Sequence, residues 1–183
     1  MNVRRVVTGH NKAGKAIFVS DAQVEPITTA LLHGSEFHRL WGSDRTPGFP
    51  DDGSPPAQPG YFPPVGGFRF GMFSLPPGSH VRPAIADRGT AFREVEEKLP
   101  GLLAHMEPDS PGMHTTATID FEVVLEGEVW LELDDGQEVR LQTGDTVVQN
   151  GTRHAWRNKS DKIARLAVFI IGAEHRHVPR TQS

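Results

Sequence analysis

The sequence predicts an all-β fold, a sandwich or barrel of short antiparallel strands formed by one domain. Glycine and proline, 19 and 15 of the 183 residues, interrupt the whole chain at short intervals. The second half contains alternating apolar and polar segments separated by turn sequences, a pattern typical of antiparallel β proteins. Only one segment, after residue 90, has the apolar spacing of a helix. The length suits one hydrophobic core, so we expect residues 1–183 to form a single domain.

The first half is expected to supply the N-terminal strands and a long loop. Strands are predicted within residues 3–11, 15–20, 36–43 and 66–79. Residues 44–67 are so rich in proline and glycine that such a stretch is usually a disordered linker. Its aromatic residues Phe49, Tyr61 and Phe62 favour instead an ordered loop on the barrel surface. We therefore divide the domain into residues 1–67, the barrel 68–172 and a tail 173–183.

The one predicted helix begins at Thr90, a plausible N-cap, and ends before Pro100-Gly101. Phe92, Val95 and Leu99 fall on one face at helical spacing. Residues 102–106 are expected to add a further turn. Because this helical segment interrupts the β pattern, it is a candidate lid over a nearby site.

The second half has the clearest strand pattern. Val129, Leu131 and Leu133 alternate with polar or aromatic neighbours, and the sequence breaks at 134–136, 143–145 and 150–152. The Asp-Gly step in the first break predicts a hairpin. Residues 166–172 are apolar on both faces, so we expect a strand that is buried on both sides.

Composition excludes several classes of function. The net charge is −4 and no basic stripe is present, which argues against nucleic acid or an anionic membrane as partner. With no cysteine, the chain forms neither disulfides nor thiolate metal sites. No secretory leader and no apolar run of about 18 residues is seen. We expect a cytoplasmic protein that acts on a small molecule.

The segment GMHTTATIDFEVVLEGE, residues 112–128, has a polar and an apolar face. Alternation along a strand places His114, Thr116, Thr118, Asp120, Glu122 and Val124 on one face. The opposite face carries Ile119, Phe121, Val123 and Leu125. If the polar face lines a pocket, the apolar face must pack against the N-terminal strands or against a second copy of the chain. We expect a homodimer.

This segment resembles the first of two motifs of the cupins, which are small barrels of jelly-roll type. His114, Thr116, Asp120 and Gly127 occupy the positions of that motif, with threonine in place of its second histidine and aspartate in place of its glutamate. Gly144, His154 and Asn158 match the second motif, which here is one residue short. The resemblance implies a cupin-type jelly-roll β-barrel, a double-stranded β-helix, with one short helix and a long Pro/Gly-rich loop.

The resemblance further implies a metal site formed by His114, Asp120 and His154. Two histidines and one carboxylate with open positions suit a catalytic Zn, Fe or Mn ion, and the ligand types do not choose among them. Thr116 is a poor ligand and would leave a position open. Glu122 is an alternative carboxylate on the same face. The competing interpretation is that the histidines are hydrogen-bonded core residues and that Asp120 only accepts local hydrogen bonds.

Five further residues are candidates for the pocket. His105 is a candidate acid or base, and Arg69 or His80 a candidate catalytic residue. Arg69 should point inward because Phe68 and Phe70 flank it. Arg82 is a weaker candidate for a substrate carboxylate, with a solvated loop arginine as the alternative. Trp156 shares parity with His154 and is expected to pack in the core.

Three functions follow from these observations. The first is a metal-dependent lyase or isomerase of dehydratase or decarboxylase type, which stabilises an enolate of a small oxygenated molecule. The second is a non-haem Fe(II) dioxygenase, since the same ligand set suits that chemistry. The third is a non-catalytic small-molecule-binding module that has lost its metal. The sequence contains no nucleophile motif, phosphate loop or dinucleotide fingerprint.

Overall fold

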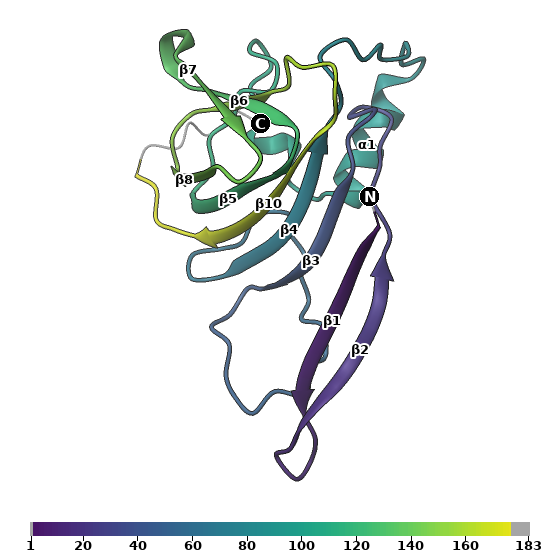
Figure 1. Ribbon diagram of the computed structural model, residues 1–183, viewed down its shortest axis with the longest axis vertical. Helices are drawn as coiled ribbons and strands as arrows, with labels where there is room; N and C mark the ends of the chain where they lie inside the picture. Colours follow the sequence, from purple (N-terminus) through teal and green to yellow (C-terminus); the bar gives the residue numbers. More distant parts are fainter. Residues whose placement is uncertain (1, 177–183) are drawn as a thin grey trace.

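The computed structural model describes residues 2–176, so the end of the predicted tail, residues 177–183, lies outside the described part. Ten strands, one α-helix and two 3-10 turns follow one another along the chain (Figure 1). The helix α1 spans Arg88–Lys98, and the turns η1 and η2 span Leu103–His105 and Asp134–Gly136. The strands are β1 (Val3–His10), β2 (Ala16–Val24), β3 (Phe37–Ser43), β4 (Phe68–Leu75), β5 (Thr118–Glu126), β6 (Glu128–Glu132), β7 (Glu138–Gln142), β8 (Thr146–Asn150), β9 (Ala155–Arg157) and β10 (Ala164–Gly172).

The barrel consists of a five-stranded sheet, β3-β4-β10-β5-β8, and a three-stranded sheet, β7-β6-β9. All strand pairs are antiparallel, and β10 lies between β4 and β5, far from both in sequence. One core cluster joins the two sheets, because Val124 and Leu166 of the larger sheet pack with Val129 and Leu141 of the smaller one. Each such buried side chain stabilises the fold by about 1.5–3 kcal/mol. The expected all-β jelly-roll architecture is confirmed.

The helix starts three residues earlier than expected, because Asp87 and not Thr90 is its N-cap. The Asp87 carboxylate accepts a hydrogen bond from the backbone N–H of Thr90 at 3.0 Å. Val95 is fully buried as expected, but Phe92 is 49% exposed. Ala91, four residues before Val95, takes the inward position instead. The expected further turn is present as η1.

The long loop is ordered because it packs on this helix. Val95, Leu99 and Leu102 form a second cluster against Tyr61 and Phe62. The rings of Tyr61 and Phe62 lie edge to face, with centroids 5.0 Å apart. The expectation of an ordered loop is confirmed, since Tyr61 and Phe62 bury apolar area that a solvated linker would lack, although Phe49 is 80% exposed.

The outer face of the larger sheet is open in the single chain. In β10, Leu166, Val168 and Ile170 are buried, whereas Phe169 is 38% exposed. The expectation that β10 is buried on both faces was therefore wrong for the chain by itself. Register aligns Phe169 with Phe70 and Phe121, and Phe121 with Val148, so the exposed side chains form one row across four strands.

The N-terminal hairpin leaves this row uncovered. Strands β1 and β2 pair only with each other and extend away from the barrel (Figure 1). Arg5 attaches the hairpin to β3 through a hydrogen bond to the Leu40 carbonyl and a cation–π contact with Trp41. Phe18 at its tip is 80% exposed, and Phe121 on the motif strand is 42% exposed. Within the described residues, no helix is long and apolar enough to cross a membrane.

Candidate functional site

Two histidines meet at one end of the barrel interior. The backbones of His114 and His154 exchange two hydrogen bonds, of 2.9 and 3.0 Å, and their ring centroids are 4.2 Å apart. Nδ1 of His114 lies 3.0 Å from the carbonyl oxygen of Gly112, and Nδ1 of His154 lies 2.9 Å from that of Thr152. A carbonyl oxygen only accepts, so each Nδ1 carries the proton and each Nε2 presents a lone pair.

Burial keeps this histidine pair neutral. Burial, together with the smaller effect of the neighbouring His114, lowers the pKa of His154 to about 3. The pKa of His114 is lowered by burial and then by His105. Neutral imidazoles with a free Nε2 are the form that binds metal ions or accepts a proton. The arrangement therefore suits either a metal ion or a hydrogen-bond donor from a ligand.

His105, predicted as an acid or base, lies close to the pair. Its Nδ1 is 3.1 Å from the carbonyl oxygen of Thr115, which again leaves Nε2 available. The edge-to-face contact with Phe62, at 4.8 Å between centroids, fixes the ring. The turn η1 thus places a third imidazole beside the histidine pair.

Two carboxyl groups project from β5 into the barrel, each with one oxygen that has no partner among the described residues. Asp120 and Glu122 are only 5% and 4% exposed. Within residues 2–176, neither Oδ1 of Asp120 nor Oε2 of Glu122 has a hydrogen-bond partner. Their cross-strand neighbours on β10 are the apolar residues Ile170 and Val168. Buried polar atoms are normally paired, so these two oxygens indicate that the interior receives a ligand, a cation or water.

The same burial changes their protonation. It raises the pKa of Asp120 to about 6, against a smaller lowering by Thr118. Burial, followed by the charge of Asp120, raises the pKa of Glu122 well above its ordinary range. Both groups can therefore hold a proton near neutral pH, since the charged forms lack a compensating partner.

Thr116, at the position of the cupin motif's second histidine, is fully buried. Its hydroxyl lies 2.7 Å from that of Thr118, so the two side chains satisfy each other. A threonine hydroxyl that is already paired is a weak ligand for a metal ion. The open position expected at Thr116 is thus lined by hydroxyl groups and not by a third imidazole of the motif.

The histidine half of the predicted metal site fits an ion, because both Nε2 atoms are available and Asp120 has an unpaired oxygen nearby on the motif strand. The complete set is not assembled. In the described part of the chain, no group of three or more His, Asp or Glu side chains is close enough to hold a metal ion. The three-ligand site of His114, Asp120 and His154 stays a prediction.

Arg69 points into the barrel as expected and is 5% exposed. Its guanidinium already has partners, however. It pairs with Asp44 at 2.5 Å and donates to the carbonyl oxygens of Gly60 and Phe68. This arrangement holds the long loop against the barrel and does not favour a catalytic role for Arg69.

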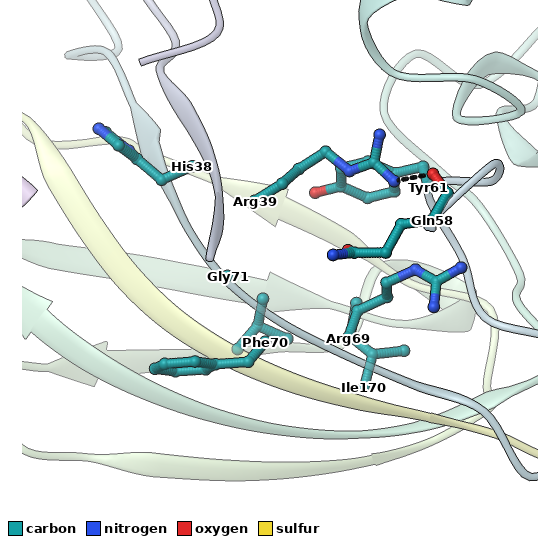
Figure 2. A pocket seen from close by; sticks show the side chains of 9 residues that line it. His38, Arg39, Gln58, Tyr61, Arg69, Phe70, Gly71 and Ile170 are labelled. Atoms are coloured by element: carbon teal, nitrogen blue, oxygen red, sulfur yellow. Dashed lines mark hydrogen bonds between the residues drawn. The ribbon is translucent and has the colours of Figure 1, made fainter. Parts of the chain in front are cut away.

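Sequence reasoning missed Arg39, which enters the same pocket from β3. Its alternation with Phe37, another inward residue, was the available indication. Figure 2 shows Arg39, Arg69, Gln58 and Tyr61 grouped along one side of this pocket, while His38 points away from them. The dashed line in Figure 2 is the hydrogen bond from Arg39 to the Gln58 carbonyl oxygen, 2.6 Å long.

The remaining candidates lie elsewhere. His80 Nε2 is 2.8 Å from Nδ1 of His33, and the two rings stack with centroids 5.0 Å apart. That pair is not part of the histidine site, so a catalytic role for His80 stays a prediction without structural support. Arg82 is exposed, as the solvated-loop alternative expects. Trp156 packs against the main core and edge-on to His154, as expected for a core residue.

Comparison with known proteins agrees with the barrel fold. Residues 102–171, less than half of the chain, match the cupin domain family. This segment is a cupin domain. The match contains all three predicted metal ligands, His105, the strands β5 to β9 and all but the last residue of β10.

Several fungal proteins are similar to this cupin over short stretches. It is 45% identical over 60 residues to oryzines biosynthesis cluster protein J of Aspergillus oryzae, covering 33% of this chain and 34% of that protein. It is 48% identical over 58 residues to phomopsin biosynthesis cluster protein C' of Diaporthe leptostromiformis, covering 32% and 31%. Cupin-domain-containing oxidoreductase srdB of Neurospora crassa is 36% identical over 76 residues, covering 39% of each. The matched stretch thus spans about a third of the length of these relatives.

Solved structures resemble this cupin only distantly. The cupin domain of Schizosaccharomyces pombe Cnp3 has a TM-score of 0.44 at 12% identity, covering 93% of this chain and 87% of that one. The cupin domain of an XRE family transcriptional regulator from Enterobacter cloacae has a TM-score of 0.37 at 19% identity, covering 58% and 83%. Likeness at this level carries no argument about function.

Proposed function

We propose that this cupin is a metal-assisted lyase or isomerase, of dehydratase or decarboxylase type, that acts on a small oxygenated molecule through an enolate-like intermediate. One observation carries the proposal. Two imidazole lone pairs, on His114 and His154, share the barrel interior with unpaired carboxyl oxygens of Asp120 and Glu122. Unpaired groups of both kinds suit a reaction in which charge develops on a substrate oxygen and a proton moves.

His114 and His154 would hold a divalent ion, Zn, Fe or Mn, and Asp120 would be the third ligand. Such an ion supplies positive charge that stabilises a developing oxyanion. His105 is the proposed proton carrier, because Thr115 holds its Nδ1 and leaves Nε2 to accept or donate. Apolar side chains of β10, among them Val168 and Ile170, exclude water and so strengthen the charge interactions in the barrel.

A second candidate is a non-haem Fe(II) oxidoreductase. The relative from Neurospora crassa is called a cupin-domain-containing oxidoreductase, and the same histidines and carboxylate suit Fe(II). A third is a non-catalytic binding protein, favoured by the absence of an assembled three-ligand cluster in residues 2–176. A cytoplasmic location stays a prediction under all three.

The deciding experiment loads the chelated protein separately with Zn, Mn and Fe(II) under nitrogen. Each form is then incubated in D2O with a panel of small hydroxy and oxo acids, and NMR follows exchange of C–H for C–D and formation of products. The proposal expects anaerobic exchange or turnover that is lost in His154→Ala. Turnover that requires both oxygen and Fe(II) would instead identify an oxidoreductase, and ligand binding without exchange in any form would identify a binding protein.

A further inference from the structure

Arg39 carries a guanidinium edge with no partner inside the barrel. Its Nη2 donates to the carbonyl oxygens of Gln58, at 2.6 Å, and Gly60, at 3.0 Å. Among the described residues, its Nε and Nη1 make no hydrogen bond and no carboxylate pairs with it. Arg69, by contrast, uses its Nε and both terminal nitrogens and pairs with Asp44. A partly buried guanidinium without a counter-charge is costly unless an anion completes it.

The pocket beside this edge is polar and narrow. Tyr61, Gln58 and Arg69 line it together with the apolar Val168 and Ile170. Oε1 of Gln58 is buried there without a partner in the described chain. The enclosed space, about 20 Å³, has room for water or for the end of a ligand, and not for a ring. A planar carboxylate is the anionic group that best fits both this space and the planar fork of arginine.

The local charge favours an anion. Arg39 and Arg69 are close enough that the charge of Arg69, after the effect of burial, lowers the pKa of Arg39. Only Asp44 pairs with either arginine. Two guanidinium groups and one paired carboxylate leave one positive charge uncompensated on this side of the pocket.

The pocket lies on the same inner face of the sheet as the carboxyl groups of the proposed site. Cross-strand register places Arg39, Gly71, Val168 and Glu122 in one row on the inner face of the sheet. Tyr61 lies near both Arg39 and the acidic residues, since Arg39, Asp120 and Glu122 all influence its pKa. A ligand here meets a cation at one end and groups that bind hydroxyl or carbonyl oxygens at the other.

We propose that Arg39 binds the carboxylate of the substrate, and that the substrate is therefore a small hydroxy or oxo carboxylic acid. That the bound acid is a substrate rests on the proposed function, whereas the binding of an anion by Arg39 does not depend on it. Arg39 would orient the acid so that its second oxygen faces the histidine and carboxyl groups. Phosphate and sulfate should bind less well, because they are bulkier and lack the planar two-oxygen edge.

Binding can be tested without turnover, by calorimetry and thermal shift on the full chain. Lactate, glycolate and pyruvate are the probes, with lactamide and inorganic phosphate as matched controls. Arg39→Met should weaken lactate binding about tenfold to a hundredfold, the expected loss of a charge-assisted hydrogen bond. Arg39→Lys, which can still donate to a loop carbonyl, should also lose affinity because it lacks the planar fork.

Arg5→Lys is a matched control outside the pocket. It loosens the attachment of the hairpin to β3 at Leu40, next to Arg39, and should lower the melting temperature, yet it changes no residue that lines the pocket. Lactate affinity in this variant should stay within about threefold of wild type. Equal losses in Arg5→Lys and Arg39→Lys would overturn the proposal, because both would then reflect a general loss of stability. Equal binding of lactamide and lactate would overturn it as well.

His154→Ala distinguishes this inference from the proposed function. If the anion site is real, His154→Ala still binds lactate through Arg39 even though it neither exchanges nor turns over any acid. Lactate binding that is abolished by His154→Ala and unchanged by Arg39→Met would assign the carboxylate to the histidine site, and the inference would be wrong.

Discussion

His114 and His154 are joined by two backbone hydrogen bonds, and their rings lie 4.2 Å apart. The two residues are 40 positions apart in sequence, so the contact exists only because the barrel closes. Arg153, next to His154, binds the Glu107 carboxylate with two hydrogen bonds of 2.6 Å. Glu107 in turn donates its N–H to Met113, next to His114. The pair is thus held on both sides, as expected of a preorganised site.

Metal content tests the ligand assignment. His114→Ala and His154→Ala should each remove most of the bound metal after reconstitution, measured by elemental analysis, because each deletes an Nε2 donor. Thr116→Ala should retain nearly all of it, since the Thr116 hydroxyl pairs with Thr118. Thr116→His should tighten metal binding and reduce activity by filling an open position. Equal loss of metal in all three alanine variants would show that the assignment is wrong.

The buried Asp120 should make the metal-free protein less stable as pH rises. Its pKa is about 6 in the folded state and near 3.8 when unfolded, so the folded state holds the proton more tightly. The contribution of Asp120 to stability is then largest below pH 4, falls by roughly 3 kcal/mol as pH rises from about 4 to about 6, and levels off above. With a chelator at pH 8, Asp120→Asn should therefore raise the melting temperature.

The same variant at pH 4 is the control, because Asp120 is then largely protonated and Asn should have little effect. Excess Zn or Mn at pH 8 should make wild type melt at a higher temperature than Asp120→Asn, since a metal ion stabilises the charged carboxylate that Asn lacks. If the order at pH 8 is the same with and without metal, Asp120 is not a ligand.

His105 should affect catalysis without affecting metal content. His105→Gln keeps a hydrogen-bonding side chain but removes the imidazole that would accept and donate the proton. We expect kcat to fall about a hundredfold or more, with loss of the corresponding limb of the pH–rate profile and little change in KM. His33→Gln, in the surface pair with His80, is a matched control and should behave as wild type. An unchanged pH profile in His105→Gln would exclude a proton-transfer role.

We propose that two copies cover the exposed row of β4, β10, β5 and β8. Each phenylalanine presents roughly 200 Å² in all, so the partly exposed side chains of this face sum to several hundred Å². A stable dimer buries about 800 Å² per partner. The outer face of the larger sheet supplies about half of this area. The apolar hairpin residues Ile17, Phe18 and Val19 supply more.

Sedimentation at micromolar concentration should therefore give twice the 20.1 kDa chain mass. Phe121→Glu should give monomers, because it places a charge in the middle of the row. Phe92→Glu, at an exposed phenylalanine on α1, is the matched control and should remain dimeric. A wild-type chain that sediments as a monomer would show that the face stays exposed or binds another partner.

The sequence by itself determined where most of the strands lie along the chain and which side chains share each face of β5. Alternation is a local property, because successive side chains of a strand point to opposite faces whatever surrounds them. It correctly placed Asp120 and Glu122 inside and Phe121 outside. The Asp-Gly turn likewise fixed the β6–β7 hairpin, with Asp135 and Gly136 both at positive φ.

Only the tertiary structure decided which inward-pointing polar side chains already have hydrogen-bond or ion-pair partners. Arg39 and Arg69 both precede or follow apolar residues in predicted strands. Arg69 is paired by Asp44 and the long loop, whereas one edge of the Arg39 guanidinium is left without a partner in the described chain. Phe92 and Phe169 fit a buried pattern, but no segment within residues 2–176 covers them. Pairing and covering depend on segments that are distant in sequence, and local periodicity contains no information about where such segments meet.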